Sequence, residues 1–273
     1  MQIKILSPLW GYEQINRTDF LDKIKNAGYD GLDTWLPETF AEKRLLFNYL
    51  DKEEMCLVTH QHAAEGSTFK KFRSSYFSNL QKCAEPNPLL INSHTGKDYF
   101  CIAQQLELID TAAEFSAKTG ITVVHETHRG RMGYTPQMTE ELFKKNKEFL
   151  LTADFSHWVC VTESMLENFT DILQQAIQRT RHIHARVGFE QGPQISDPRA
   201  PEWQYAVNKF LGWWDEIVEV NEQKNTPVLT MTTEFGPPPY MPVIPFSQEP
   251  LADQFTINCY MKDLLRQRYG NYC

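Results

Sequence analysis

Carboxylate and imidazole side chains recur along this chain of 273 residues, each just after a short apolar run and about 30 residues from the next. Only the last interval is clearly longer. Such side chains are the usual ligands of divalent metal ions, and they also carry out general acid–base catalysis. The regular spacing indicates repeated structural units that bring distant side chains together. The residues are Asp33, His62, His94, Glu126, Asp154, His184 and Glu234.

We predict a metal site formed by Glu126, Asp154, His184 and Glu234. Several carboxylates and imidazoles gathered in one place would repel one another or stay unpaired, and a divalent cation resolves both problems. Mixed Glu, Asp and His ligands suit manganese, zinc, magnesium or iron, and the sequence does not choose among them. His182 is the alternative to His184, because residues two apart share one face of a strand. We prefer His184 because it lies nearer the following loop.

The elements that position these residues are short apolar runs alternating with helical segments. The runs are rich in β-branched residues, and each is followed by a polar or turn residue. We therefore expect eight strands. They cover residues 4–6, 31–36, 55–59, 88–92, 121–125, 149–154, 182–187 and 227–233.

Capping residues mark the ends of several predicted helices. Thr18 is the expected N-cap of the first helix, and Gly28 follows its last residue. Thr135 followed by Pro136 is a typical helix start, and Gly120 ends the apolar periodicity that begins at residue 102. Two further helices are expected over 205–220 and 252–268.

Eight strand–helix units in a chain of this length predict a single-domain (β/α)8 TIM barrel, an α/β fold, over residues 1–273. A doubly wound sheet is the main competitor, but the sequence has no Gly-rich phosphate-binding motif. Two irregular segments, 188–201 and 236–250, follow the last two strands. Both lie on the side of a barrel where active sites are built.

Composition narrows the class of protein. The net charge is −8, from 27 Lys and Arg against 35 Asp and Glu, so we expect no nucleic-acid partner. No apolar run is long enough to span a membrane, and the first residues resemble a strand rather than a signal peptide, so we expect a cytoplasmic protein. Six scattered cysteines are read as free thiols.

Four segments together resemble the last four strand ends of the xylose-isomerase-like barrels, a superfamily of sugar isomerases, ketose 3-epimerases, inosose dehydratases and apurinic endonucleases. The resemblance covers nearly the whole chain. It implies one metal ion held by Glu126, Asp154, His184 and Glu234, with Glu126 and Glu234 as the paired acid and base. It also implies a substrate-binding His157. The segments read VHETHR (124–129), DFSH (154–157), HIHAR (182–186) and TEFG (233–236).

The endonuclease branch of the superfamily holds three zinc ions with additional histidines and an Asp-x-His motif. His62 and His94 could occupy the first positions, but the third reads Asp197-Pro198-Arg199, and arginine does not ligate metals. This difference and the acidic charge argue against a trinuclear nuclease. We instead expect His62, His94, His157 and Arg199 to bind substrate. His60 and His62 share one strand face, and either could face the site.

Other polar residues near the strand ends favour structural roles. His125 alternates with Glu126 and is expected to point into the layer between barrel and helices, and Asp33 is more typical of a structural residue. For Trp10, lining one side of the pocket and packing in the core are equally compatible with the sequence. His128 fits equally a substrate contact and a solvated loop residue.

The predicted function is isomerisation or epimerisation of a sugar or related polyhydroxy carbonyl compound. A bound dication would polarise the carbonyl, and two glutamates would move the proton from the neighbouring carbon. Dehydration of a polyol ketone begins with the same step and is the alternative. An endonuclease-like phosphodiesterase and a non-catalytic sugar-binding barrel are less favoured. A homo-oligomer is compatible with the sequence, which identifies no interface.

Overall fold

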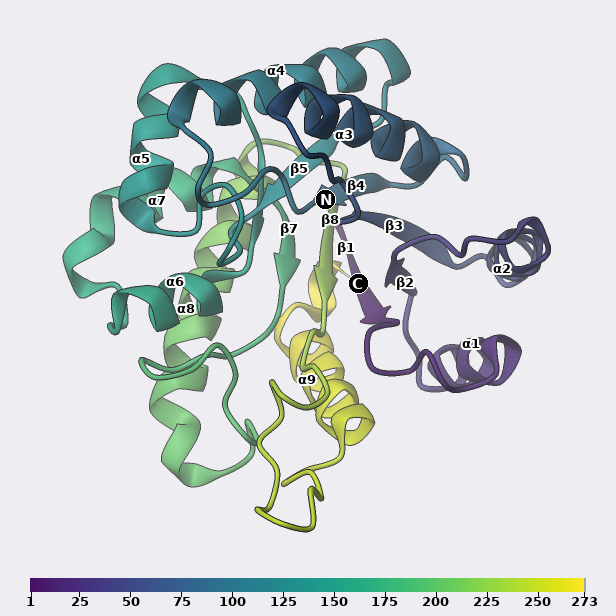
Figure 1. Ribbon diagram of the computed structural model, residues 1–273. Coiled ribbons are helices and arrows are strands. Elements are labelled where there is room, and N and C mark those ends of the chain that lie inside the picture. The colour runs from purple at the N-terminus through teal and green to yellow at the C-terminus, as the bar shows by residue number, and fades with distance from the viewer. Residues whose placement is uncertain (273) are drawn as a thin grey trace.

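The structure, a computed structural model, describes residues 1–272. Eight parallel strands pair in sequence order, and the last pairs with the first, so the sheet closes into a barrel. Figure 1 shows the strands at the centre and the helices around them. The strands are β1 (Gln2–Pro8), β2 (Gly31–Thr34), β3 (Cys56–Gln61), β4 (Leu90–Ser93), β5 (Val123–Glu126), β6 (Leu151–Ala153), β7 (Thr180–His184) and β8 (Val228–Thr232).

Helices follow the strands along the outside of the barrel. Two helices, rather than one, connect β6 to β7, and the first of them begins directly at the end of β6. The helices are α1 (Arg17–Asn26), α2 (Phe40–Lys52), α3 (Phe69–Ala84), α4 (Ile102–Thr119), α5 (Pro136–Lys145), α6 (Phe155–Thr162), α7 (Thr170–Arg179), α8 (Gln204–Gln223) and α9 (Gln254–Arg268).

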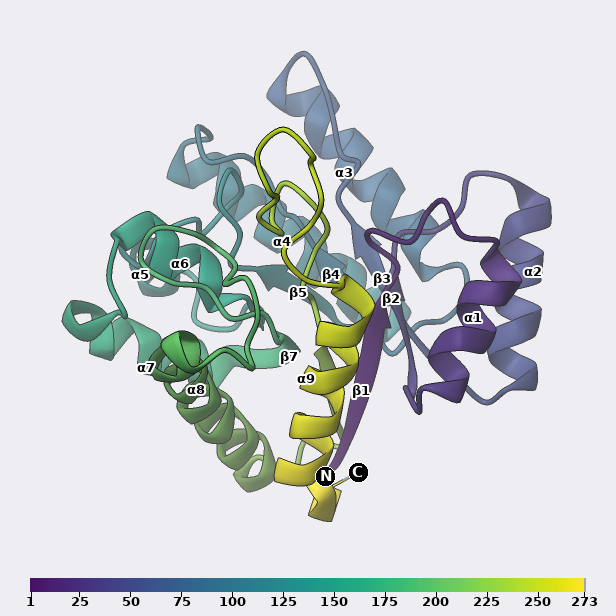
Figure 2. The same cartoon turned by 90° about the horizontal axis from the view of Figure 1, so that it is seen from below.

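The predicted (β/α)8 barrel is confirmed, and all eight predicted strands are present with ends displaced by at most three residues. Parallel strands are covered on both faces and therefore give continuous apolar runs, which are visible in the sequence. In Figure 2 the last helix, α9, lies along β1, where it covers the junction at which the barrel closes. None of the described helices is long and apolar enough to cross a membrane.

Most of the predicted helix ends are confirmed. Thr135 caps α5 with Pro136 in its first turn, and Gly120 ends α4 in the left-handed conformation at φ 75°. The predicted N-cap Thr18 is wrong, because Asn16 caps α1 and accepts hydrogen bonds from the backbone N–H groups of Thr18 and Asp19. An Asn side chain performs the same capping role as Thr, so the two candidates compete at this position.

The inner side of the barrel is polar toward the carboxyl ends of the strands. Asn92 on β4 donates to Glu126 Oε2 at 2.7 Å and accepts from Thr152 Oγ1 at 2.7 Å. On the opposite strands, His182 Nδ1 lies 2.6 Å from Thr230 Oγ1. Buried polar groups require partners, and a satisfied network holds its members in fixed positions. This hydrogen-bond network in the barrel interior supports the site residues and holds them in place.

The two irregular segments after β7 and β8 are tied together. The Gln194 side chain donates to the Gly236 carbonyl at 3.2 Å and accepts from the Gly236 N–H at 2.7 Å. A Cβ at Gly236 would lie 2.2 Å from the ring of Trp10, so a residue without a side chain is needed there. The close approach fixes the Trp10 indole at the mouth of the barrel.

His125 points into the layer between barrel and helices, as predicted. Its Nδ1 lies 2.7 Å from Thr95 Oγ1, and its ring packs edge-on against Phe149 at 5.6 Å. The residue is buried, and burial lowers the pKa of His125 to about 3. The imidazole is therefore neutral in the folded protein at neutral pH.

This neutral histidine makes stability depend on pH. The unfolded chain takes up a proton at His125 below its ordinary pKa of about 6.5, whereas the folded protein does not until about 3. The stabilisation is complete above pH 6.5 and falls toward pH 3, by on the order of 1 kcal/mol for each pH unit. We expect His125→Gln to reduce the difference in unfolding free energy between pH 7 and pH 5, measured by urea titration. An unchanged difference would contradict this assignment.

Candidate active site

The four predicted metal ligands lie together at the carboxyl end of the barrel. One donor atom from each of Glu126, Asp154, His184 and Glu234 lies within 4.8 Å of the others, and all four residues are buried. They come from the ends of β5 and β7, from the start of α6 and from the segment after β8. Parallel strands of a barrel end on the same rim, which explains how residues so distant in sequence meet.

His184 is oriented by the residues around its two ring nitrogens. Nδ1 lies 2.9 Å from Glu234 Oε2 and 3.5 Å from Glu126 Oε1, while Nε2 lies 3.2 Å from Asp33 Oδ2. Burial opposes a charge on this imidazole, but the two glutamates prevail and raise the pKa of His184 well above its usual value. Nδ1 therefore faces the two predicted glutamate ligands, and Nε2 faces an orienting carboxylate. This arrangement is common for metal-binding histidines.

The donor set fits a divalent cation. His184 Nδ1 and Glu234 Oε2 are buried and, within the described residues, have no partner with hydrogen-bond geometry. Three carboxylates converge on this point, and Arg186 is the only described cavity-lining residue with a guanidinium or ammonium group. Buried carboxylates normally pair with cations or bind metals, and unpaired buried atoms are costly. A dication among the four donors would satisfy both requirements.

Asp33 connects the two histidines of β7. Its Oδ2 lies 3.1 Å from His182 Nε2 and 3.2 Å from His184 Nε2, and it accepts from Thr232 Oγ1 at 2.9 Å. Burial alone would raise the pKa of Asp33, but hydrogen bonds from the two histidines hold it far below its usual value. Asp33 is therefore an ionised carboxylate that orients His184.

We expect Asp33→Asn to weaken binding of Mn²⁺ or Mg²⁺ about 10- to 100-fold, because residues behind a metal ligand set its orientation and basicity. Isothermal titration calorimetry measures this directly. Asp51→Asn, at an exposed position on α2, is the matched control and should leave the affinity unchanged. Equal affinities for all three proteins would show that Asp33 does not orient a ligand.

Glu126, one of the four predicted metal ligands, also faces His94, which follows β4, and His60 on β3. Its Oε2 is 3.0 Å from His94 Nε2 and 3.7 Å from His60 Nε2. Burial raises the pKa of Glu126, but the charges of His94 and His184 outweigh burial and hold it well below its usual value. The group is therefore a carboxylate, which is the form that can accept a proton.

Asp154 is the N-cap of α6 and accepts a hydrogen bond from the Ser156 N–H at 3.2 Å. It also contacts the Arg186 guanidinium. Burial raises the pKa of Asp154 to about 6, although Arg186 opposes the rise. Arg186 also lies 3.3 Å from Glu234 Oε2. The guanidinium therefore contacts two of the carboxylates that are predicted to bind the metal ion.

Imidazoles form an arc along one side of the site. The ring centroids of His60 and His94 are 4.4 Å apart, those of His94 and His128 are 4.4 Å apart, and those of His128 and His157 are 4.0 Å apart. Burial lowers the pKa of His60 and His157 well below the usual value and that of His128 to about 3. Neutral imidazoles both donate and accept, which suits the hydroxyl groups of a sugar.

The structure separates His60, which lies on β3, from His62, which follows the strand directly. His60 lies against Glu126 and His94, while the predicted substrate-binding residue His62 lies farther out, with its ring tilted against that of Trp35 at a centroid distance of 5.3 Å. Both residues line the cavity. A regular strand places residues two apart on the same face, so the sequence alone could not rank them.

Arg199 is not brought to this cavity. Its guanidinium is half exposed and pairs with Asp197 at 2.6 Å. Arg186, which sequence reasoning overlooked, supplies the buried guanidinium instead. The sequence did indicate this role, because His182, His184 and Arg186 are spaced two residues apart. Side chains at this spacing share one face of an extended chain.

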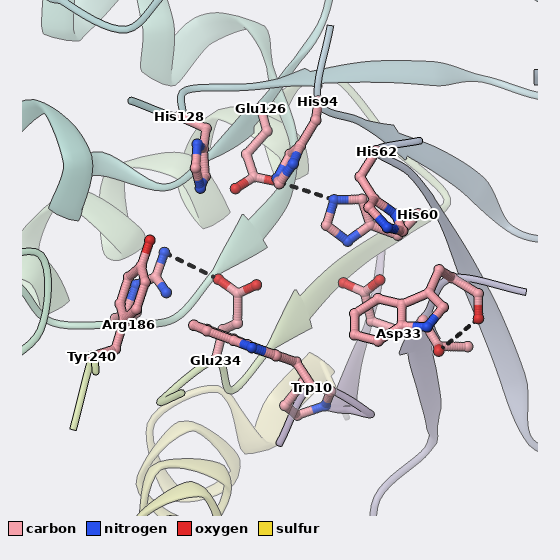
Figure 3. Close-up of a pocket in the computed structure, with 13 residues that line it drawn as sticks. Trp10, Asp33, His60, His62, His94, Glu126, His128, Arg186, Glu234 and Tyr240 are labelled. Atoms are coloured by element: carbon pink, nitrogen blue, oxygen red, sulfur yellow. Dashed lines mark hydrogen bonds and ion pairs between the residues drawn. The ribbon is translucent and has the colours of Figure 1, made fainter. Parts of the chain in front are cut away.

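The cavity above these groups has a volume of about 250 Å³. Figure 3 shows Trp10 and Tyr240 on one side of it and His60, His94 and His128 on the other. The Arg186 guanidinium lies 4.8 Å from the Tyr240 ring and holds that wall in place. The volume is near the lower limit for ligand pockets, so the cavity suits a compound the size of one sugar ring.

Comparison with solved structures gives full-length matches. A D-tagatose 3-epimerase-like protein is 16% identical, with a TM-score of 0.65, over 100% of this chain and 98% of that chain. The probable 3-DHS dehydratase AsbF of Bacillus anthracis is 16% identical, with a TM-score of 0.61, over 96% of this chain and 98% of that chain. A xylose isomerase-like TIM barrel protein of Mycobacterium smegmatis, in complex with magnesium, is 10% identical, with a TM-score of 0.65, over 97% of this chain and 95% of that chain.

No protein-family model and no curated protein sequence matches the chain. The structural matches establish the fold, which is that of the xylose-isomerase-like TIM barrels. The predicted resemblance is thus confirmed for the fold. A shared fold does not fix the function, which depends on the residues of the site.

Proposed function

We propose that this protein is a divalent-metal-dependent isomerase or epimerase of a sugar or a related polyhydroxy carbonyl compound. The observation that carries the proposal is the buried quartet of Glu126, Asp154, His184 and Glu234 beneath a cavity the size of one sugar ring. The proposed substrate is a small carbohydrate rather than a nucleic acid. Proteins of this fold include a D-tagatose 3-epimerase-like protein, which supports the proposed reaction, and a protein in complex with magnesium, which supports the proposed divalent metal.

The four quartet residues would hold the metal ion, and the donor set alone does not select among Mn, Zn, Mg and Fe. When bound, such an ion polarises a carbonyl group and thereby acidifies the neighbouring C–H bond. Asp154 and His184 are the members with purely binding roles, since both are enclosed by other protein groups. Glu126 and Glu234 also line the open cavity.

Glu126 and Glu234 are the proposed acid and base. One would accept the proton from the carbon next to the carbonyl, and the other would return a proton or handle that of the hydroxyl. Glu126 is held as a carboxylate, which suits the accepting role. Arg186 contacts Glu234 Oε2 at 3.3 Å and would keep that carboxylate aligned.

The remaining cavity residues would bind and orient the substrate. His60, His62, His94 and His128 line the cavity and can exchange hydrogen bonds with hydroxyl groups, while Trp10, Trp35 and Tyr240 offer apolar faces to C–H groups. His157, behind His128, accepts a hydrogen bond from the Arg186 guanidinium at its Nε2, at a distance of 3.0 Å. It would act by positioning that guanidinium.

The proposal is tested by isotope exchange. The metal-loaded protein is incubated in D₂O with the four ketohexoses fructose, tagatose, psicose and sorbose, and deuterium incorporation is followed by mass spectrometry and NMR. We expect incorporation at a carbon next to the carbonyl of at least one sugar. Absence of exchange from all four, with metal bound, would count against the proposed reaction on simple ketohexoses.

Dehydration of a polyol ketone is the second candidate. It begins with the same proton removal and would use the same residues, and the match to a probable dehydratase supports keeping it. Product analysis separates the two reactions. Loss of water creates an enone that absorbs in the ultraviolet and lowers the product mass, whereas isomerisation conserves mass.

A further inference from the structure

A second cavity adjoins the candidate active site. It is a groove of about 770 Å³ bounded by the segment after β2, the start of α2, the end of β3 and the end of α3. Trp35, His60 and His62 line both this groove and the central cavity, so the two spaces meet at these side chains. Figure 3 shows His60 and His62 at that edge of the central cavity.

The groove contains a buried hydrogen-bond donor without a partner. Gln61 lines it with a side chain that is 1% exposed, and its Oε1 accepts from Ser93 Oγ at 3.0 Å. Its Nε2 has no hydrogen-bond partner among the described residues. A buried amide donor left unpaired destabilises a fold, so a ligand acceptor at this point would satisfy a need that the protein itself leaves open.

The lining of the groove suits a neutral group rich in hydroxyls. Arg17, Lys43 and Lys82 contribute positive charge, Glu38 and Glu42 contribute negative charge, and Lys43 is further paired with Glu85 at 2.6 Å. Mixed charges of this kind supply both donors and acceptors without favouring an anion. Trp35, which is partly exposed, adds a flat apolar face at the junction.

We propose that the substrate is a glycosylated keto sugar, whose keto unit occupies the central cavity and whose second sugar unit occupies the groove. This inference rests on the proposed function, since it assigns the substrate class of the same site. The central cavity has room for one ring only, and the adjoining groove is about three times as large. The groove therefore favours substrates larger than a monosaccharide.

The experiment compares free ketohexoses with disaccharides that carry a glycosylated ketose. The disaccharide panel is turanose, palatinose, maltulose and lactulose, and the readout is kcat/KM for deuterium exchange in D₂O with Mg²⁺ bound. We expect at least one disaccharide to exceed its parent ketose by tenfold or more. Free ketoses that exchange as well as every disaccharide would overturn the groove assignment and leave the proposed function standing. Failure of both panels would overturn both.

A groove-filling variant locates the effect. Ala63 is exposed and lines the groove, so Ala63→Trp should lower the disaccharide-to-ketose ratio of kcat/KM at least tenfold. Ala117→Trp, on an exposed face of α4 outside both cavities, is the matched control and should leave the ratio unchanged. An unchanged ratio in Ala63→Trp would contradict occupation of the groove by the second unit.

Discussion

Replacing Glu126 or Glu234 by Gln is expected to lower the rate of carbon-bound hydrogen exchange by about 10³-fold or more. Gln is nearly the same size, but it neither accepts a proton at the pH of the reaction nor carries a charge toward the metal position. General acid–base catalysis alone contributes about 10²- to 10⁴-fold, and each glutamate is also a predicted ligand. The measurement is deuterium incorporation into the sugar that the wild-type protein exchanges fastest.

Two controls accompany this prediction. Glu114→Gln, at an exposed position on α4, should retain wild-type exchange. Metal content, measured by mass spectrometry on each variant at saturating metal, separates loss of the acid or base from loss of the ion. Full activity in both the Glu126 and the Glu234 variant would refute the assignment of these residues as acid and base.

Removal of the metal is expected to abolish exchange, and adding Mn²⁺ or Mg²⁺ back should restore it. Binding to the folded state alone should also stabilise the protein by about 3 kcal/mol at a metal concentration 100-fold above Kd. In Asp154→Ala and His184→Ala we expect this metal-dependent stabilisation to disappear over the same concentration range, because each variant removes one of four donors. Differential scanning calorimetry with and without metal measures the effect.

The calorimetry of the Asp154 and His184 variants needs a charge control because of Arg186. Its guanidinium contacts Asp154 and Glu234, so a general loss of charge balance could mimic loss of a ligand. Arg199→Ala, which removes an exposed guanidinium paired only with Asp197 in the described contacts, serves as the charge control and should keep the stabilisation by metal. Metal-dependent stabilisation that persists in the Asp154 and His184 variants would exclude the quartet as the binding site.

The fold was predictable because each strand is buried on both faces. The runs around Val58, Val124 and Ile183 contain buried apolar residues, and such runs recur with helical segments between them. The quartet followed from the same pattern, since a polar residue at or just after the carboxyl end of a buried parallel strand lies on the rim of the barrel. His184 was distinguishable from His182 only by its position nearer the loop. In the structure it is His184 whose Nδ1 lies against Glu126 and Glu234, and its role as a metal ligand stays a prediction.

The remainder depends on contacts between residues that are distant in sequence. Whether His60 or His62 lies against Glu126 is decided by how far β3 extends, and the strand continues to Gln61. Arg186 lies two residues beyond the end of β7, and its place in the site is set by its contacts with Asp154 and Glu234, which come from other parts of the chain. Arg199 formed a local pair with Asp197 two residues away, and sequence spacing does not reveal such a contact in advance.

The most direct test of the account is a crystal structure of the Mn²⁺-loaded protein with anomalous scattering measured at the manganese edge. The account predicts one strong peak per chain, within coordination distance of Glu126, Asp154, His184 and Glu234, with His184 binding through Nδ1. A barrel mouth without a peak at saturating metal, or a peak whose ligands do not include this quartet, would contradict it.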